Sequence, residues 1–290
     1  MIDFSSEGPL LVFGGPYSNL RATEAMRREA GRLGIPATRV ICTGDIVAYC
    51  AEPEETARAV RDWGCHAIQG NCEEQLAAGA ADCGCNFEEG TACDLLARGW
   101  YPFAAARVPR ELCDWMGGLP RTLDFRFSGL TFRVVHGGGE VINRWVFASD
   151  TAAITEEMRA AACDVVVGGH CGVPFIARSG TAMWFNPGVI GMPANDGTTD
   201  VWYGLIERDG GGVKLSTHRL AYDHHAAAAD LRRHGHANGY ARTLITGIWP
   251  SFDVLPAAEK AATGVRLRPR SVRLVPGVGG RPKAEAEPVL

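Results

Sequence analysis

Four residues of types that can bind metal ions closely follow short apolar segments of the sequence. They are Asp45, Asn71, His136 and His170. The carboxyl ends of neighbouring strands meet at one edge of an α/β sheet, so these four side chains are expected to come together. A carboxylate, an amide oxygen and two imidazoles suit Zn, Fe or Mn better than Ca. The set therefore predicts a transition-metal site.

Each of these residues alone has an ordinary structural explanation. An Asp or His that follows a strand is more often a cap or a satisfied loop group than a metal ligand. The ordered series Gly-Asp, Gly-Asn, His-Gly and Gly-His is much harder to produce by chance. The series, rather than any single member, supports the metal-site hypothesis.

Short apolar strands alternate with amphipathic helices over the first two thirds of the chain, which is the pattern of a layered α/β domain. A hairpin with a Ser-Gly turn is predicted around residues 123–135, and a closing hairpin around 201–220. Further strands are predicted at residues 10–13, 39–42, 65–68 and 165–167, with helices at 20–33 and 54–63 and helical segments with loops between 73 and 118.

We expect three segments along the chain. Residues 1–222 carry the layered domain and the candidate site, and residues 223–262 form a C-terminal helix followed by a covering loop. Residues 263–290 are rich in Pro, Gly and Arg without a strong periodic pattern, which predicts an extended tail lying on the domain or partly mobile.

Composition narrows the class of protein. The chain has 290 residues, of which 46% are hydrophobic and 21% charged, so it can bury a full core. Its 29 basic and 33 acidic residues give no support to a nucleic-acid surface or a membrane surface. No basic region precedes the first apolar run, so we expect a cytoplasmic protein whose ten cysteines are reduced thiols or metal ligands. The oligomeric state is left open.

Five motifs follow one another along the chain: GDIVAY at 44–49, GNCE at 70–73, VVHGG at 134–138, VVVGGHCG at 165–172 and FNPGVIGMP at 185–193. Together they resemble the calcineurin-like metallophosphoesterases, in particular the bacterial branch with diadenosine tetraphosphatase-like and small phosphodiesterase members. The resemblance implies a four-layer α/β/β/α sandwich of two mixed sheets flanked by helices. It also implies two metal ions at the sheet edge that activate a water for attack on phosphorus.

The first of the two metal sites departs from the family pattern. Gly15 and Tyr17 stand where the family has Asp-x-His, and Gly172 stands where it has the second histidine of Gly-His-x-His. The resemblance assigns all three missing ligands to the first site, whereas the four ligands of the second site are present. It therefore implies one divalent or trivalent transition metal (Fe, Zn or Mn) at Asp45, Asn71, His136 and His170.

Two further residues have candidate catalytic roles. Cys72 stands where many family members have a histidine that contacts the phosphate and assists the leaving group. Tyr17 could donate a hydrogen bond to phosphate or bind a ferric ion as a phenolate, or it could simply fill the space of the lost ligands. The amide of Asn71 and the Gly70–Asn71 backbone are expected to orient the phosphate.

A soft-ligand site is a separate hypothesis. Cys72, Cys83 and Cys85 lie close together in the sequence and could hold a thiophilic metal. The simpler explanation is that they are small buried hydrophobic residues, because the spacing Cys-x-Cys is unspecific. We favour the simpler explanation and keep Cys83 and Cys85 as accessory thiols.

The sequence thus predicts a metal-dependent phosphoesterase that hydrolyses a small phosphodiester or phosphomonoester through a metal-activated water. The alternative is a catalytically weak or inactive relative that binds a phosphorylated ligand or a protein partner on an intact fold. A first site filled by side chains favours the alternative, and a water-filled pocket keeps catalysis open.

Overall fold

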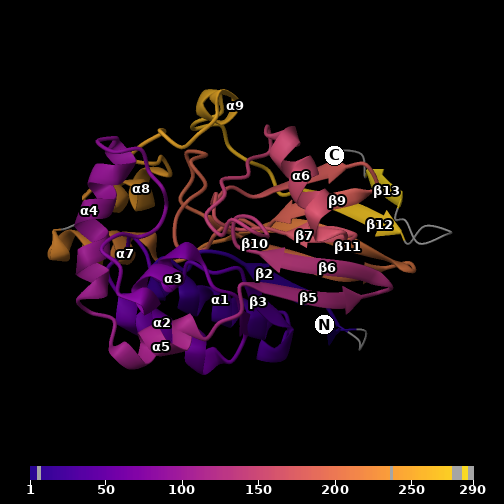
Figure 1. Ribbon diagram of the computed structural model, residues 1–290, viewed down its shortest axis with the longest axis horizontal. Helices are drawn as coiled ribbons and strands as arrows, with labels where there is room; N and C mark the ends of the chain where they lie inside the picture. The colour runs from indigo at the N-terminus through magenta and orange to yellow at the C-terminus, as the bar shows by residue number, and fades with distance from the viewer. Residues whose placement is uncertain (5–7, 236–237, 276–282, 287–290) are drawn as a thin grey trace.

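The computed structural model describes residues 1–4, 8–235, 238–275 and 283–286, and these residues form two stacked sheets with helices on their outer faces (Figure 1). The six-stranded sheet has the order β1 (Ile2–Asp3), β5 (Thr122–Phe127), β6 (Leu130–Val135), β7 (Val165–Val167), β9 (Ala182–Asn186) and β8 (Phe175–Ser179). The seven-stranded sheet has the order β13 (Lys283–Ala286), β12 (Ser271–Val275), β11 (Gly212–Leu220), β10 (Val201–Asp209), β2 (Leu10–Phe13), β3 (Val40–Cys42) and β4 (His66–Ala67). The predicted α/β sandwich of two mixed sheets flanked by helices is confirmed.

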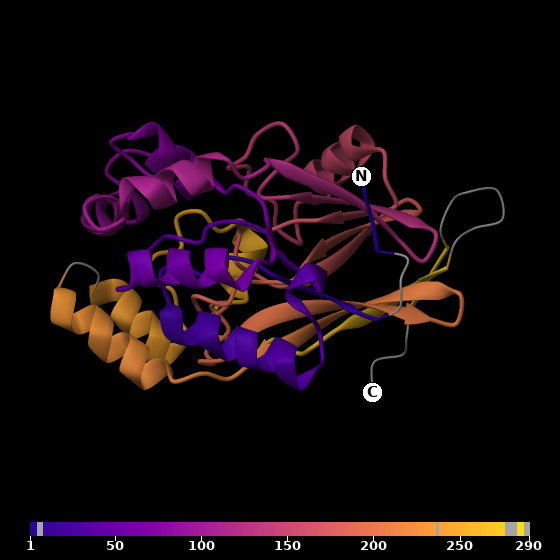
Figure 2. The ribbon, with the colours of Figure 1, turned by 90° about the horizontal axis from the view of Figure 1, so that it is seen from below.

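Helices occupy the outer faces and one end of the molecule (Figures 1 and 2). Before the first hairpin come α1 (Leu20–Arg32), the 3-10 helix η1 (Ala37–Arg39), α2 (Pro53–Trp63), α3 (Asn71–Ala78), α4 (Ala92–Ala105) and α5 (Arg110–Gly117). The later helices are α6 (Thr151–Ala161), α7 (His224–His234), α8 (Asn238–Thr246) and α9 (Ala257–Ala261). Among the described residues, no helix combines the length and the apolar character that a bilayer-spanning segment needs.

Strand β2 shows why the apolar runs of this sequence become central strands. All four of its residues are fully buried, because one face of the strand packs on the facing sheet and the other on helices. Leu10 and Val12 belong to the cluster between the sheets, whereas Leu11 and Phe13 belong to the cluster under the helices. Burial of each such side chain contributes roughly 1.5–3 kcal/mol to folding.

The parallel strands set the position of the candidate site. Strands β2, β3 and β4 pair in parallel in one sheet, and β6, β7 and β9 pair in parallel in the other. Their carboxyl ends therefore point to one edge of the sandwich, where the chain leaves each strand in a loop. The four predicted ligands follow β3, β4, β6 and β7, so the fold delivers them to this edge.

The C-terminal part differs in detail from the expectation. The predicted helix within 223–247 consists of two helices, α7 and α8, because α7 ends at Gly235 in the left-handed conformation with φ 71°. Part of the predicted tail forms β12, which pairs antiparallel with β11 and buries Leu274 completely. Residues 276–282 and 287–290 of that tail lie outside the described residues. The hairpin β8–β9 was not predicted as a pair of strands.

Candidate metal centre

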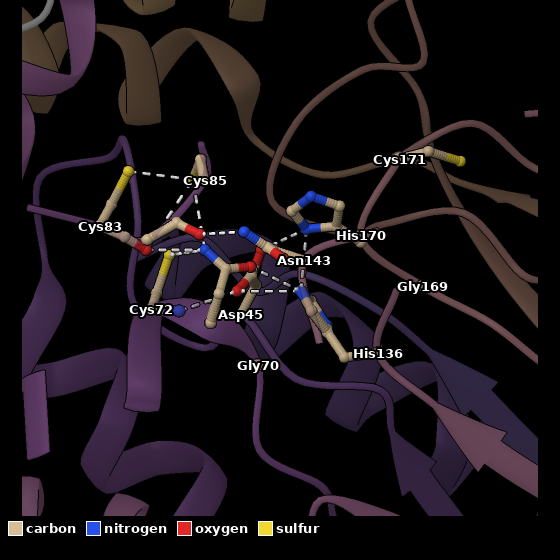
Figure 3. Close-up of polar contacts among 12 residues, drawn as sticks. Asp45, Gly70, Cys72, Cys83, Cys85, His136, Asn143, Gly169, His170 and Cys171 are labelled. Carbon is tan, nitrogen blue, oxygen red and sulfur yellow. Dashed lines mark hydrogen bonds and ion pairs between the residues drawn. The ribbon is translucent and has the colours of Figure 1, made fainter. Parts of the chain in front are cut away.

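Four electron-pair donors converge at the carboxyl edge of the sheets. The Nε2 atom of His136 lies 3.1 Å from Oδ1 of Asn71, 3.1 Å from Nδ1 of His170 and 3.3 Å from Oδ1 of Asp45 (Figure 3). Nδ1 of His170 lies 3.9 Å from Oδ2 of Asp45. The structure therefore brings all four predicted ligands together, and each of them is at most 5% exposed.

The tautomer of His136 follows from its hydrogen bond to the backbone. Nδ1 of His136 lies 2.7 Å from the carbonyl oxygen of Thr43, and a carbonyl can only accept, so Nδ1 carries the proton. The lone pair of Nε2 then faces the other three donors. A carbonyl that holds the distal nitrogen of a histidine in this way is the usual support of a metal-binding imidazole.

The charges of the cluster favour the binding of a cation. Burial lowers the pKa of His136, but the Asp45 carboxylate and the Thr43 carbonyl raise it above its ordinary value. Burial and, when no metal ion is bound, the positive charge of protonated His136 lower the pKa of His170 to about 3, so His170 is a neutral ligand. One positive charge is thus favoured beside Asp45, and a metal ion can supply it.

The amide of Asn71 is oriented by a loop. Its Nδ2 atom donates to the carbonyl oxygen of Cys83 over 2.8 Å, which leaves Oδ1 facing His136. Ligands about 2.0–2.2 Å from one ion lie roughly 3–4 Å from each other, and the separations in this cluster fall in that range. The residues present therefore fit one Zn, Fe or Mn ion.

Two of these ligands have a strained backbone. Asp45 has φ 56° and His170 has φ 55°, in the left-handed region that residues other than Gly rarely adopt. The loops also approach one another closely, since a β-carbon added at Gly70 would lie 2.5 Å from both N and Oδ1 of Asp45. Strain and close approach of this kind are typical of functional loops that the surrounding fold holds in place.

A buried carboxylate that sequence reasoning missed holds the first two loops together. Glu73 is fully buried, and its Oε2 accepts from the backbone N–H groups of Asp45 and Gly70 over 2.7 and 2.8 Å. Its Oε1 accepts from those of Ile46 and Val47 over 2.8 and 3.2 Å. Glu73 stands directly in the GNCE motif, and an acidic residue at the third position of a helix is the signal that could have indicated it.

The variant Glu73→Gln is expected to loosen the site without removing a ligand. Its amide group would place a donor against two backbone donors, which costs about 1–3 kcal/mol of stability. Metal affinity is expected to fall by about 10–100-fold, as for other supporting residues of metal sites. Calorimetric titration with Mn²⁺ measures this, with Glu74→Gln as control. An unchanged affinity would show that Glu73 does not position Asp45.

A family comparison agrees with this geometry. The model of the calcineurin-like phosphoesterase superfamily domain matches residues 18–211, which is more than half of the chain. The chain belongs to the calcineurin-like phosphoesterase superfamily. No curated protein sequence matches the chain.

Solved structures share the calcineurin-like fold with this chain. A metallophosphoesterase from Sphaerobacter thermophilus is 22% identical, with a TM-score of 0.65 over 84% of this chain and 100% of its own. A hypothetical protein from Pyrococcus horikoshii OT3 is 16% identical, with a TM-score of 0.69 over 83% of this chain and 99% of its own. At these identities the likeness shows the shared fold alone.

Tyr17, Val189 and Trp249 surround the positions where the calcineurin-like pattern expects ligands of the first metal, and they also border a small cavity. A β-carbon added at Gly15 would lie 2.5 Å from Cζ of Tyr17 and 2.8 Å from Cγ1 of Val189. A β-carbon added at Gly172 would lie 3.5 Å from the ring of Trp249. The residues at this place do not fit a metal ion, because aromatic and aliphatic groups have replaced its ligands.

Tyr17 lies inside this packing rather than at the surface. It is 4% exposed and its ring meets the ring of Tyr49 edge-on at 4.7 Å. Burial and the charge of Asp45 raise its pKa well above the ordinary value, so the side chain is a neutral phenol. This position agrees with space filling and with a hydrogen-bond donor better than with a phenolate ligand.

The three predicted thiols lie beside the cluster, on the side of Asp45 away from His136 (Figure 3). Sγ of Cys83 and Sγ of Cys85 are 2.9 Å apart, and Nδ2 of Asn71 donates to Sγ of Cys85 over 3.2 Å. Sγ of Cys72 lies 3.6 Å from the same Nδ2, and the Cys72 backbone N–H points to Oδ1 of Asp45 over 3.5 Å. The thiols thus surround the amide of Asn71. Cys171 points away from the site.

The double variant Cys83→Ser, Cys85→Ser is expected to keep its metal. The contact that orients Asn71 is made by the backbone carbonyl of Cys83, which serine retains. Elemental analysis of the purified variant should therefore give the same metal-to-protein ratio as the unmodified chain. A lower ratio would show that these thiols are ligands, and Cys113→Ser, a buried thiol of helix α5, serves as the control.

Proposed function

We propose that this protein is a phosphoesterase that hydrolyses a small phosphodiester or phosphomonoester at one metal ion held by Asp45, Asn71, His136 and His170. The convergence of their four donor atoms within one buried cluster carries the proposal. A metal bound there supplies polarisation of a phosphoryl oxygen and activation of water. With one metal, other groups must stabilise the leaving oxygen.

The chain's own residues prepare this site. The carbonyl of Thr43 fixes the ring of His136, and Glu73 holds the Asp45 loop against the start of helix α3. The backbone N–H of Gly70 is engaged by Glu73, so it does not orient a phosphate. What α3 can offer an anion is the positive end of its dipole at Asn71.

Cys72 and Tyr17 are the proposed neutral groups near the reacting phosphate. Cys72 is fully buried beside Asp45, and in this proposal it replaces the family's histidine as a weak donor. Tyr17 packs against Gly15 at the first site, and its phenol is proposed to donate to a phosphoryl oxygen. Both contributions are modest compared with that of the metal ligands.

The test is hydrolysis of bis(4-nitrophenyl) phosphate and 4-nitrophenyl phosphate by protein loaded with Mn²⁺, Zn²⁺ or Fe²⁺. Release of nitrophenolate by the unmodified chain and by His66→Ala, but not by His136→Ala, is the expected result. His66 is a matched control because it contacts the carbonyl of Thr38, away from the site. A metal-loaded protein that hydrolyses neither ester would contradict the proposal.

A second candidate function is binding without turnover. The observation in its favour is that the rings of Tyr17 and Trp249 lie where the first site would have its ligands. In this case the chain would bind a phosphorylated ligand or a partner through the metal centre. Metal-dependent binding of a phosphodiester without hydrolysis would support this candidate.

The proposed setting is the cytoplasm. All ten cysteines are free, which agrees with a reducing compartment. The proposed substrate is a small molecule, because the donor cluster is buried rather than spread over a surface.

A further inference from the structure

A small cavity of about 60 Å³ borders the candidate metal centre. Six aromatic side chains line it: Tyr17, Tyr49, Phe87, Trp145, Tyr240 and Trp249. Aromatic walls of this kind bind flat apolar groups by stacking and edge contacts. The cavity therefore has the chemistry of a binding pocket for a ring.

The rings fall into two groups of mutual contacts. In the first group Tyr49 lies 4.7 Å from Tyr17 and 4.6 Å from Tyr240, measured between ring centroids. In the second group the centroid of Trp145 lies 6.3 Å from that of Phe87 and 4.1 Å from that of His170. Both groups line the cavity, so an occupant would contact aromatic rings of each.

His170 joins this cavity to the metal centre. Its ring lines the cavity, and its Nδ1 belongs to the donor cluster. Its Nε2 is buried and has no hydrogen-bond partner among the described residues. Figure 3 shows this part of the ring pointing away from Asp45. His170 thus borders both the donor cluster and the cavity, so an ester bound at the cluster would have the cavity beside it.

The uncharged side chains of the lining favour one class of phosphoester over another. None of the described residues that line the cavity is a Lys, Arg, Asp or Glu. A monoester carries up to two negative charges, and no side chain there can compensate the second one. A diester carries one charge and two organic groups, so it suits one metal ion and an apolar wall better.

The size of the cavity limits the occupant. At roughly 10–15 Å³ for each water, about 60 Å³ corresponds to a handful of waters. This is less than the roughly 150 Å³ of a closed cavity that holds benzene, so at most one ring can enter, and lining side chains must move to admit it. Two of the six rings lie on the C-terminal side of the part that the family model matches, because that match ends at residue 211. They are Tyr240 on helix α8 and Trp249 in the loop after it, both in the C-terminal segment.

We propose that this cavity binds a single aryl ring of a phosphodiester monoanion whose phosphoryl group lies at the metal centre. This substrate class rests on the proposed phosphoesterase function. The C-terminal segment 223–262 then has a defined role, since it closes the pocket that recognises the ester group.

Binding of two unreactive diesters tests the proposal without depending on turnover. Diphenyl phosphate and diethyl phosphate carry the same charge and differ in the rings, and calorimetry with the metal-loaded full chain gives both affinities. Diphenyl phosphate is expected to bind about tenfold or more tightly than diethyl phosphate. It should also bind more tightly than phenyl phosphate, which has one ring and the higher charge. Equal affinities for the two diesters would overturn the proposal.

Two variants of Trp249 test whether this ring causes the preference for diphenyl phosphate. Trp249→Ala is expected to reduce the preference for diphenyl phosphate severalfold, and Trp249→Phe to keep most of it. Phe252→Ala is the matched control, because Phe252 lies in the same loop, is 37% exposed and does not line the cavity. Metal content is measured for each variant as a check on the fold. An unchanged preference in Trp249→Ala would also overturn the proposal.

The two proposals fail in different ways. Hydrolysis of nitrophenyl esters without any preference for aryl diesters would leave the phosphoesterase function and remove the aryl pocket. Tight, metal-dependent binding of diphenyl phosphate without hydrolysis of any ester would keep the aryl pocket and remove the catalytic function.

Discussion

The variant Asp45→Asn is expected to lose its metal and, with it, any phosphoesterase activity. Asparagine keeps the shape of the side chain and tolerates the left-handed backbone at this position, where φ is 56°. Only the negative charge that attracts the cation is removed. Substitution of a residue that supports a metal ligand already lowers metal affinity by about 10–100-fold. Substitution of a direct ligand should therefore lower it by about 100-fold or more.

Metal analysis after dialysis and calorimetric titration with Mn²⁺ measure this loss. Asp62→Asn is the control, because Asp62 lies at an exposed position of helix α2 and pairs with Arg61. The thermal midpoint of the metal-free variant should stay close to that of the metal-free parent, since the substitution lies in a loop. A variant that retains the parent's metal content would remove Asp45 from the site.

The variant Gly15→Asp, which restores one ligand of the lost first site, is expected to destabilise the protein strongly. The new β-carbon would lie 2.5 Å from the ring of Tyr17, so the core must shift. Overpacking of this kind costs about 1–3 kcal/mol, and the left-handed backbone at φ 39° adds roughly 1–2 kcal/mol. Urea unfolding should therefore show a loss of roughly 2–5 kcal/mol.

Gly34→Asp separates the two costs. Gly34 also has a left-handed backbone, with φ 68°, but no atom lies within 4 Å of an added β-carbon. It is expected to lose only the roughly 1–2 kcal/mol that belongs to the backbone. Equal losses at both positions would show that Tyr17 does not fill the first site.

The triple variant Gly15→Asp, Tyr17→His, Gly172→His extends this test. It restores all three missing ligands, but Val189 and Trp249 still occupy the surrounding space. We therefore expect it to bind no second metal ion. A gain of a second ion would show that the emptied site can reopen.

The elements that carry the ligands could be predicted because their signals are local. Strand β2 is a run of four buried residues, and the hairpin β5–β6 alternates around a Ser-Gly turn. Each predicted ligand follows a strand in a fixed order, and parallel strands have only one carboxyl edge. The layered α/β class and the shared edge of the four ligands thus followed from pattern and topology, whereas the sandwich of two mixed sheets was implied by the resemblance to the calcineurin-like family.

The remainder of the site depends on contacts between distant parts of the chain. Glu73 binds four backbone N–H groups of two loops, and its place at the third position of helix α3 indicates only its contact with Gly70, not those with the distant Asp45 loop. Trp249 reaches the neighbourhood of Gly172 from a loop that follows α8. Strand β12 is short, and its pairing with β11 rather than its own composition makes it a strand. Such features appear only when the chain is folded.

The metal content of the purified protein tests the central claim most directly. Elemental mass spectrometry of the digested sample gives the metal and its ratio to protein. One Fe, Zn or Mn ion per chain is the predicted result, because one set of four ligands is complete and the other place is surrounded by Tyr17, Val189 and Trp249 instead of ligands. Two ions per chain, or a protein that refuses added metal altogether, would contradict the account.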